Sequence, residues 1–339
     1  MVAGDAEENT MSLESARPVN PTPDDFAGSA LPRVAKRLFH ATRPKFFPAS
    51  VLPVIAGSSW GVYAVGQFDA VAFFLALLAT VCVHAASNVL NDVGDDLNGT
   101  DGRNDKRIYP YTGGSRFIQI GILDSSAMLR LGVSLLAVAV VSGALLYTLK
   151  GPGVLLFGLA GVAIGVLYSL GPIRLSSLGL GETAVAVAFG VLPVGGAAWL
   201  QGAAINMDLL LYSLPISAWV ASILLINEVP DIEADGASGK RTLPVRLGLM
   251  GTARLFLLLQ VAASAVVVLL AFKGAVPILS PLLPIGLLAL ALRATAAIKI
   301  GVHDRDNMTQ AIESTLAIHT VGSLWLSACM LFALWWPSA

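Results

Sequence analysis

Two short acidic segments have the residue types and the spacing of a divalent-cation site. They are Asn91–Asp95, which opens the Asp-rich loop Asn91–Asp101, and Asn227–Asp235, and each begins with an asparagine, an acid, a valine, any residue and an aspartate. Within the second segment, Asp231 and Asp235 are four residues apart, so on a continuing helix both carboxylates face the same way. The two ends of the first segment have the same spacing. Two such faces that meet across a bundle would form a cluster of oxygen ligands.

The chemistry that fits such a cluster is the binding of Mg²⁺ together with a phosphate-bearing substrate. Mg²⁺ takes oxygen ligands, keeps some of its waters and is commonly completed by substrate phosphates. Carboxylates packed together repel one another unless cations neutralise them. For one segment alone, solvated loop acids would be an equal explanation, whereas a matched pair favours the cation site. The candidate metal ligands are Asn91, Asp92, Asp95, Asp101, Asp231 and Asp235.

Basic residues follow both acidic segments and could neutralise a diphosphate. A departing diphosphate needs cationic neutralisation, which lysine and arginine supply. Membrane topology also accounts for most of these charges, but Lys240 is close to Asp235 in the sequence and is the strongest candidate. The glycines of Gly113–Ser115 offer backbone N–H groups that could also hold phosphate. The candidate substrate-binding residues are Asn88, Asn91, Arg43, Lys45, Arg107, Arg116 and Arg241.

A third polar segment runs from Tyr168 to Glu182 and is rich in glycine. One interpretation is a simple turn that carries a basic topology signal. The functional interpretation places Tyr168 at the mouth of a cavity, where the face of its ring could stabilise a reactive cation. The candidate catalytic residues are therefore Asp95, Asp231, Asp235, Lys240 and Tyr168.

The elements that must position these residues are apolar helices. The chain of 339 residues is 55% apolar and 13% charged, whereas soluble domains are about a quarter charged. Its apolar blocks are about as long as a bilayer core is thick, and a span must satisfy its own backbone hydrogen bonds, which favours helices. The sequence therefore predicts an all-α bundle of about nine transmembrane helices. The expected spans are 46–65, 71–90, 127–148, 152–170, 183–200, 208–227, 252–272, 276–293 and 312–336.

The positions of the acidic segments in this bundle predict an internal repeat and an orientation. The segments lie 136 residues and four helices apart, which indicates a repeated four-helix unit. If the N-terminus and the long loops share one side, that side holds 19 of the 21 basic residues, and Lys150 and Lys273 lie on the other. The positive-inside rule then places the N-terminus and the Asp-rich loops in the cytoplasm and the C-terminus outside.

The remaining features divide the chain and limit its partners. Residues 1–34 are polar and contain no apolar signal region, so we expect a disordered tail before a membrane domain at 35–339. Cys82 and Cys329 lie in apolar stretches and are expected to be buried hydrophobes. The four histidines show no ligand spacing and are expected to be structural. A net charge of −1 gives no sign of a nucleic-acid partner, and no segment indicates an obligate protein partner.

At these motifs the sequence resembles the UbiA-type superfamily of intramembrane aromatic prenyltransferases. Asn91–Asp95 resembles the first Asp-rich motif of that family, and Asp231–Asp235 followed by Gly239–Leu243 resembles the second. The resemblance covers roughly residues 35–336. The ubiquinone-type pattern has a further aspartate where this chain has Gly99, and here the acid comes at Asp101. That departure is similar to the menaquinone branch, which prenylates 1,4-dihydroxy-2-naphthoate.

The resemblance implies an enzyme of the bacterial inner membrane that depends on Mg²⁺. Its substrates would be a polyprenyl diphosphate donor and an aromatic acceptor, with 1,4-dihydroxy-2-naphthoate in quinone biosynthesis as the expected acceptor. The alternative acceptors are 4-hydroxybenzoate, homogentisate or another lipid acceptor. Two alternatives outside this class are a cation-coupled membrane transporter, with the repeat as its two halves, and a non-catalytic lipid-binding protein.

Overall fold

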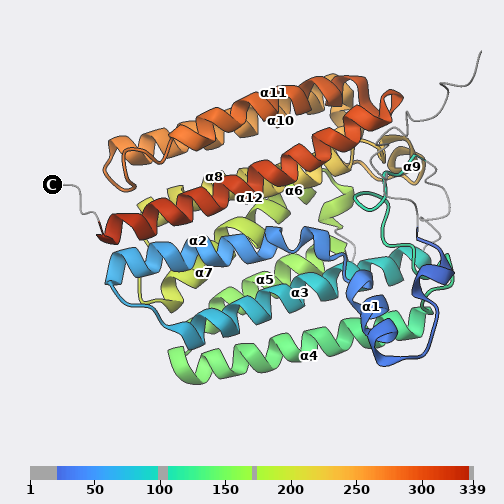
Figure 1. Cartoon of the computed structure of the whole chain (residues 1–339), viewed down its shortest axis with the longest axis horizontal. Helices are drawn as coiled ribbons and strands as arrows, with labels where there is room; N and C mark the ends of the chain where they lie inside the picture. Colours follow the sequence, from blue (N-terminus) through green and yellow to red (C-terminus); the bar gives the residue numbers. More distant parts are fainter. Residues whose placement is uncertain (1–20, 98–105, 170–173, 336–339) are drawn as a thin grey trace, which may run out of the picture.

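The computed structural model describes residues 21–97, 106–169 and 174–335, and within these ranges it is all-helical, without a strand. Long helices run side by side along the longest axis of the molecule (Figure 1). Over these described ranges, eight helical spans are long and apolar enough to cross a membrane. The long elements are α2 (Pro48–Val65), α3 (Ala70–Leu97), α4 (Ser125–Lys150), α5 (Gly153–Ser169), α7 (Leu192–Leu200), α8 (Met207–Asn227), α10 (Leu243–Phe272), α11 (Leu282–Ile300) and α12 (Arg305–Trp335).

The eight spans account for eight of the nine predicted ones. One of them, Gly181–Leu200, combines α6 (Gly181–Ala186), the π-helical turn η5 (Val187–Val191) and α7. The predicted span 152–170 corresponds to α5, an apolar helix of 17 residues. The all-helical membrane architecture is thus confirmed, while the count of nine spans stays a prediction.

Several helices begin at residues whose side chains cap them. Asp124 accepts a hydrogen bond from Ala127 N at the start of α4, at 2.7 Å. Asn206 accepts from Leu209 N at the start of α8, at 2.9 Å. Thr242 occupies the same position before α10. Such caps satisfy backbone N–H groups that have no partner within the helix, and they define where each helix begins.

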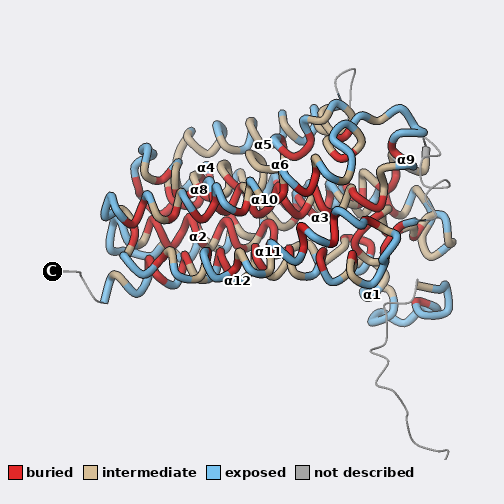
Figure 2. Tube along the Cα trace, turned by 90° about the horizontal axis from the view of Figure 1, so that it is seen from above, coloured by how far each residue is buried: buried red, intermediate tan, exposed pale blue. Residues whose placement is uncertain are grey.

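The centre of the bundle is held together by close packing of small and large residues. A Cβ atom added at Gly57 of α2 would lie 2.2 Å from the backbone oxygen of Val194 in α7, so these two helices touch at their backbones. Small residues permit this kind of close approach between membrane helices. Trp219 of α8 fills the space beside Gly322 of α12. Buried positions form the interior of the bundle, and exposed positions lie mostly on its outside (Figure 2).

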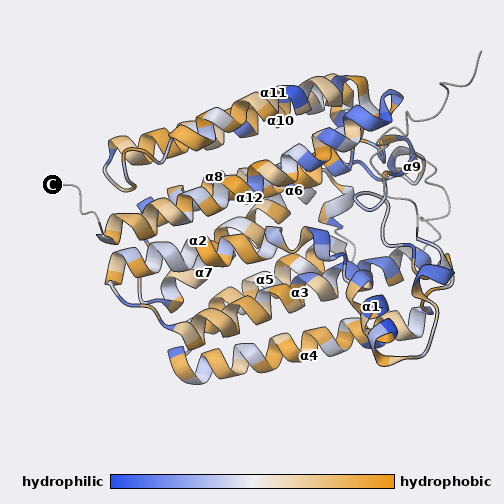
Figure 3. Ribbon diagram, in the orientation of Figure 1, coloured by the Kyte–Doolittle hydropathy of each residue, from blue (hydrophilic) through white to orange (hydrophobic). Residues whose placement is uncertain are grey.

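The outside of the bundle is apolar over its middle, and polar residues gather at one end (Figure 3). Phe272 is 81% exposed and Leu156 is 71% exposed, although both belong to long apolar helices. Large exposed apolar surfaces of this kind indicate contact with lipid. The polar end holds the short helices α1 (Leu31–Ala41) and α9 (Ile232–Ala237), and α12 ends at the opposite end (Figure 1).

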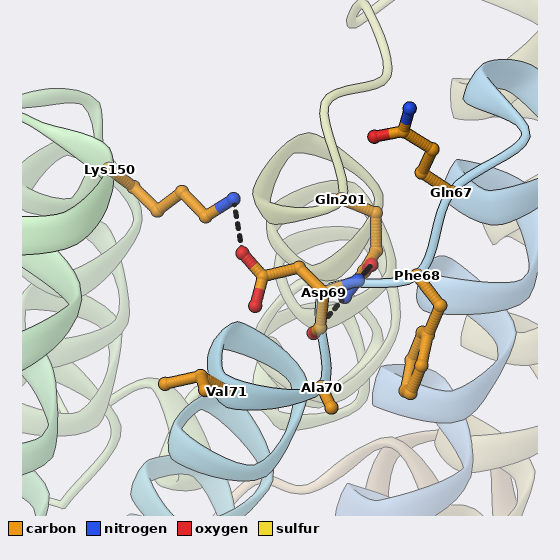
Figure 4. A pocket seen from close by; sticks show the side chains of 7 residues that line it. All are labelled: Gln67, Phe68, Asp69, Ala70, Val71, Lys150 and Gln201. Atoms are coloured by element: carbon orange, nitrogen blue, oxygen red, sulfur yellow. Dashed lines mark hydrogen bonds and ion pairs between the residues drawn. The ribbon is translucent and has the colours of Figure 1, made fainter.

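The opposite end carries two similar ion pairs. Asp69, just before α3, pairs with Lys150 at the end of α4, with 2.8 Å between Oδ2 and Nζ, beside a cavity of about 390 Å³ (Figure 4). Asp208, at the start of α8, pairs with Lys273 just after α10. Each pair therefore joins the start of one helix to the end of the next one in the bundle. This matches the predicted repeat in one feature, and the repeat itself stays a prediction.

Part of the predicted N-terminal tail is folded. Pro23–Phe26 form a 3-10 helix, and α1 begins at Leu31, so the predicted disordered tail 1–34 is wrong for these residues. The physical reason for this folding is that the polar stretch contains one aromatic side chain, Phe26, which is buried against the bundle. Phe26 is 4% exposed and packs on Phe117, with 5.0 Å between ring centroids. Residues 1–20 lie outside the described ranges.

Candidate active site

The first acidic segment forms the end of α3 at the polar end of the bundle. Asn91 is half-buried there, and Asp92 is buried, with 2% of its surface exposed. Asp95 also lies in α3, but its side chain is outside the described part of the chain, and so is all of Asp101. The metal-binding roles predicted for Asp95 and Asp101 stay predictions.

Protein partners occupy both carboxylate oxygens of Asp92. Arg43 forms an ion pair with Oδ1. Ser115 donates to Oδ2 from its backbone N–H, at 3.2 Å, and from its hydroxyl. These contacts tie the segment before α2 and the loop after α3 to the end of α3. The predicted roles of Asp92 as a metal ligand and of Arg43 as a substrate contact would compete with them.

The second acidic segment turns sharply after α8 and continues into α9. Asp235 N donates to the backbone oxygen of Asp231 at 2.8 Å, which places the two aspartates on successive turns as predicted. Lys240 Nζ lies 3.4 Å from Asp235 Oδ1. Burial raises the pKa of Asp235 above its usual value, and the ammonium of Lys240 partly offsets this effect. The site therefore holds a buried carboxyl that a cation would stabilise in its charged form.

Contacts between loops bring the two acidic segments together at the polar end of the bundle, and this place is called the motif end, or mouth, of the candidate site. Lys106, in the loop after the first segment, pairs with both carboxylate oxygens of Glu233 in α9 at 2.6 Å each. Arg241 N donates to the backbone oxygen of Ser177 at 2.9 Å, which joins the second segment to the loop after Tyr168. Three loops that are far apart in the sequence are thereby linked.

Two of the predicted substrate-binding side chains make contacts within the protein. Asn88 Nδ2 donates to the backbone oxygen of Thr42 at 3.0 Å, just before Arg43. Lys45 Nζ lies 4.9 Å from the ring centroid of Tyr111. Both residues are at the polar end, and neither role as a substrate contact is tested by these contacts.

The other predicted basic residues lie around the same mouth. Arg107 is buried, and its guanidinium lies over the ring of Tyr109, 5.6 Å from the centroid. Arg116 is half-buried and has a left-handed backbone, with φ of 57°, and Ser115 separates it from Gly113 and Gly114, which also have positive φ. Arg241 is exposed. Tyr168 is half-buried near the end of α5, and its backbone oxygen accepts a hydrogen bond from Ser176.

This arrangement of two linked acidic segments over an apolar helical bundle has counterparts among known proteins. A model of the UbiA prenyltransferase family matches residues 50–313. The chain belongs to the UbiA prenyltransferase family. The predicted family resemblance is therefore confirmed.

Similar proteins agree with this assignment. The 1,4-dihydroxy-2-naphthoate octaprenyltransferase of Mycobacterium leprae is 30% identical over 298 residues, which cover 86% of this chain and 96% of the relative. The protein of the same name from Haemophilus influenzae is 34% identical over 226 residues, covering 63% and 70%. A UbiA homolog from Archaeoglobus fulgidus solved with GPP and Mg²⁺ has the same fold, with a TM-score of 0.58 at 19% identity over 86% of this chain and 99% of that one.

In this UbiA-family chain, three polar residues near the second motif were missed as candidate site residues. Asn227 and Glu228 stand where the first motif has Asn91 and Asp92, and that equivalence was the available signal. The third residue, Glu182, lies in the first turn of α6 and is 5% exposed. No sequence signal connected Glu182 with Glu228, because they are 46 residues apart and meet only in the folded chain.

Glu182 and Glu228 form a pair of adjacent carboxyl groups. Burial raises the pKa of Glu228 well above its usual value, and the neighbouring acids Glu182, Asp235 and Asp231 raise it further. Two adjacent buried carboxyl groups cannot both ionise at low cost, so the pair holds a proton or faces a cation.

The oxygen donors around the UbiA-family motifs fit a hard cation. The Oδ1 atom of Asn227 and the Oε2 atom of Glu228 are buried and have no hydrogen-bond partner within the described part of the chain. Unsatisfied buried oxygens carry a free-energy cost that a bound cation removes. No group of three or more acid, histidine or cysteine side chains converges on one point among the described residues, and the side chain of Asp95 is outside that set. Oxygen atoms of the kind that Mg²⁺ takes as ligands are present on the described residues Asn91, Asn227, Asp231 and Asp235.

Proposed function

We propose that this chain is a Mg²⁺-dependent prenyltransferase that transfers a polyprenyl group from a prenyl diphosphate to 1,4-dihydroxy-2-naphthoate in quinone biosynthesis. The observation that carries this proposal is the linkage of two Asp-rich motifs at the polar end of an apolar bundle. Relatives that bear this enzyme name and family membership support the aromatic acceptor. The UbiA homolog bound to GPP and Mg²⁺ supports the donor class and the metal.

Some residues of the chain would bind Mg²⁺ and the diphosphate, and others would stabilise the charge on the leaving oxygen. Asn91, Asp95, Asp231 and Asp235 would hold Mg²⁺, which when bound neutralises the diphosphate and assists its departure. Lys240, already beside Asp235, would stabilise the negative charge that develops on the leaving oxygen. The basic residues Arg107, Arg116 and Arg241 around the mouth would orient the diphosphate. In this proposal Asp92 has a structural role, because its two oxygens already have partners.

The apolar bundle would exclude water from the reacting carbon. An allylic cation formed at the mouth is quenched by water, so its survival needs an apolar surrounding. Tyr168 lies near the end of α5 at this mouth and could present its ring face to the cation. An apolar groove of about 360 Å³ runs from Glu182 along α6, α8 and α10 and offers one place for an isoprenoid tail.

The proposed location is an inner membrane, with the motif end in the cytoplasm. The eight apolar spans and the family fold support an integral membrane protein. The excess of lysine and arginine at the motif end supports the cytoplasmic placement. Residues 35–339 would form the catalytic membrane domain, preceded by the N-terminal tail.

The test is transfer of a labelled prenyl group by the purified protein in lipid nanodiscs with Mg²⁺. We expect a prenylated product with 1,4-dihydroxy-2-naphthoate, and a larger kcat/KM than with 4-hydroxybenzoate or homogentisate. Asp231→Asn should lower kcat at least about 100-fold, because it removes a metal ligand. Asp208→Asn is the matched control, since it changes an aspartate at the opposite end. Equal activity of the Asp231→Asn protein and the wild type would reject the assigned site.

A further inference from the structure

His84 lies in α3 on the same helix face as two residues of the proposed site. Asn88 follows His84 by four residues and Asn91 follows it by seven, and in an α-helix these spacings place all three on one face. α3 runs from the opposite end towards the motif end, so His84 is the deepest of the three. At about 1.5 Å per residue, it lies about 10 Å further from the mouth than Asn91. That depth is suited to the reacting carbon and the acceptor ring, below the diphosphate.

The surroundings of His84 are aromatic and fix the orientation of its ring. The imidazole is 7% exposed. Phe189 meets it edge-on, with 4.8 Å between ring centroids, and Phe47 does so at 5.9 Å. Phe189 belongs to the π-helical turn Val187–Val191, and such turns frequently occur at functional sites. Aromatic rings at this depth form a surface on which a flat acceptor could lie.

Ser50 of α2 hydrogen-bonds one ring nitrogen of His84, Nδ1, and leaves the other, Nε2, available to a ligand. Ser50 Oγ and His84 Nδ1 share a hydrogen bond. When Nδ1 carries the proton and donates it to Oγ, the lone pair of Nε2 is available to a ligand. Among the described residues, Ser50 is the hydrogen-bond partner of His84, and Nε2 has none. An ionisable side chain within a membrane span is costly, and for His84 the contact with Ser50 compensates one ring nitrogen.

We propose that His84 is a catalytic residue that binds a hydroxyl group of the aromatic acceptor at Nε2 and accepts its proton during transfer. This inference rests on the proposed function and adds the base that the motifs do not supply. As the proton moves from the hydroxyl to Nε2, the oxygen electron pair enters the ring, and a ring carbon bonds to the allylic carbon. The bond from that carbon to the diphosphate oxygen breaks, and the diphosphate takes the electron pair. The product is first a ketone, which becomes aromatic again when the alkylated carbon loses its proton and the ketone oxygen regains one as a hydroxyl group.

The test compares His84→Gln and His84→Ala with the wild type in the nanodisc transfer assay. Glutamine can hydrogen-bond the hydroxyl but cannot take its proton at neutral pH. We expect His84→Gln to keep the acceptor KM within about 3-fold and to lose at least about 100-fold in kcat, the usual contribution of general-base catalysis. His84→Ala should lose the same in kcat and also raise the acceptor KM. Both variants should bind a non-reactive prenyl diphosphate analogue like the wild type, which also shows that they are folded.

His319 provides the matched control. It is the other fully buried histidine of a long helix, 1% exposed in α12, where it contacts Ser323. His319→Gln should leave kcat and the acceptor KM within about 3-fold of the wild type. Wild-type kcat in His84→Gln would overturn the assignment, and so would loss of analogue binding in both His84 variants. If the wild-type protein prenylates no aromatic acceptor, the proposed function fails, whereas active His84 variants beside an active wild type reject the role of His84 alone.

Discussion

The carboxylates at the mouth differ in what surrounds them, and their chemistry follows from these surroundings. Asp92 is fully engaged by Arg43 and Ser115, while Asp235 has Lys240 as its ion-pair partner on one oxygen. Glu228 has a second buried carboxyl next to it. A count of acids in the sequence treats all of these as equal ligands. The folded chain instead separates an anchoring aspartate from the acids that a cation would stabilise.

The ion pair between Arg43 and Asp92 predicts a large effect of truncation. The side chains are 19% and 3% exposed, so Arg43→Ala would leave a buried carboxylate without its cation. We expect a loss of about 3 kcal/mol in the free energy of unfolding, measured by denaturant titration in detergent. Lys106→Ala is the control. In the ion pair of Lys106 with Glu233 the side chains are 46% and 72% exposed, so this pair should contribute at most about 1 kcal/mol to the free energy of unfolding. Equal losses in both variants would contradict the assigned anchoring role.

The raised pKa of Asp235 predicts how Mg²⁺ binding depends on pH. Because the folded pKa is above the usual value of 3.8, protonation stabilises the metal-free folded state, and this contribution is lost as pH rises through the folded pKa. Mg²⁺ requires the carboxylate, so its binding releases a proton and weakens as pH falls through that raised pKa. Mg²⁺ titrations of donor binding between about pH 4.5 and 8 should show this weakening at a higher pH than an ordinary carboxyl gives. A Mg²⁺ affinity that is constant over that range would argue against Asp235 as a ligand.

At the scale of elements, the sequence predicts the helices well and their irregularities poorly. The apolar blocks identify the spans, and the caps at Asp124 and Asn206 are visible as residue types. The eighth block was placed at 276–293, but α11 runs over Leu282–Ile300. The prolines delay its start until after Pro281, and a pattern based on apolar residues stops too early at Arg293. The π-helical turn Val187–Val191 has no local signal in the sequence. The kink at Gly248 has a positive φ of 63°, which glycine permits, but an isolated glycine in an apolar block does not by itself indicate a kink.

The contact between α2 and α7 predicts that Gly57 cannot be enlarged. A Cβ atom at this position would lie 2.2 Å from a backbone oxygen of α7, and backbone cannot move aside as a flexible side chain can. Gly57→Ala should therefore lower the free energy of unfolding by roughly 1–3 kcal/mol, the usual cost of overpacking. Gly143→Ala in α4 is the matched control, because its added Cβ would meet nothing within 4 Å. A thermal unfolding series in detergent compares the two, and an equally stable Gly57→Ala protein would exclude the close contact.

At the scale of the whole molecule, charge is separated between the two ends, which predicts an orientation. We expect the motif end to face the cytoplasm, because Lys150 and Lys273 are the described basic residues of the opposite end and an aspartate neutralises each of them. Single cysteines at Ser238 and Gln67 can report this in a chain with Cys82 and Cys329 replaced. In intact spheroplasts, a membrane-impermeant thiol reagent should label Ser238→Cys only after lysis and Gln67→Cys before it. The reverse labelling pattern would invert the proposed topology.

The same scale shows how far a sequence can locate a site of this kind. Helix order, the shared end of both motifs and the positions of Asp231 and Asp235 follow from spacing alone. The pairing of Glu182 with Glu228 and that of Ser50 with His84 cannot be predicted from spacing. Each pair joins two elements that are far apart in the sequence, and no repeating pattern of residues indicates the contact. The burial of Phe26 could not be predicted either, since a single aromatic residue in a polar tail gives no periodic signal.

The contact between Lys106 and Glu233 has a consequence for the handling of the protein. It lies in water, and at physiological ionic strength charges are screened over about 8 Å, falling to about 3 Å in molar salt. Concentrated salt therefore weakens the link between the two motif loops while the lipid-embedded helices keep their packing. We therefore expect a preparation washed in molar salt to retain its fold and helical content, with the two motif loops held together less tightly than at physiological ionic strength.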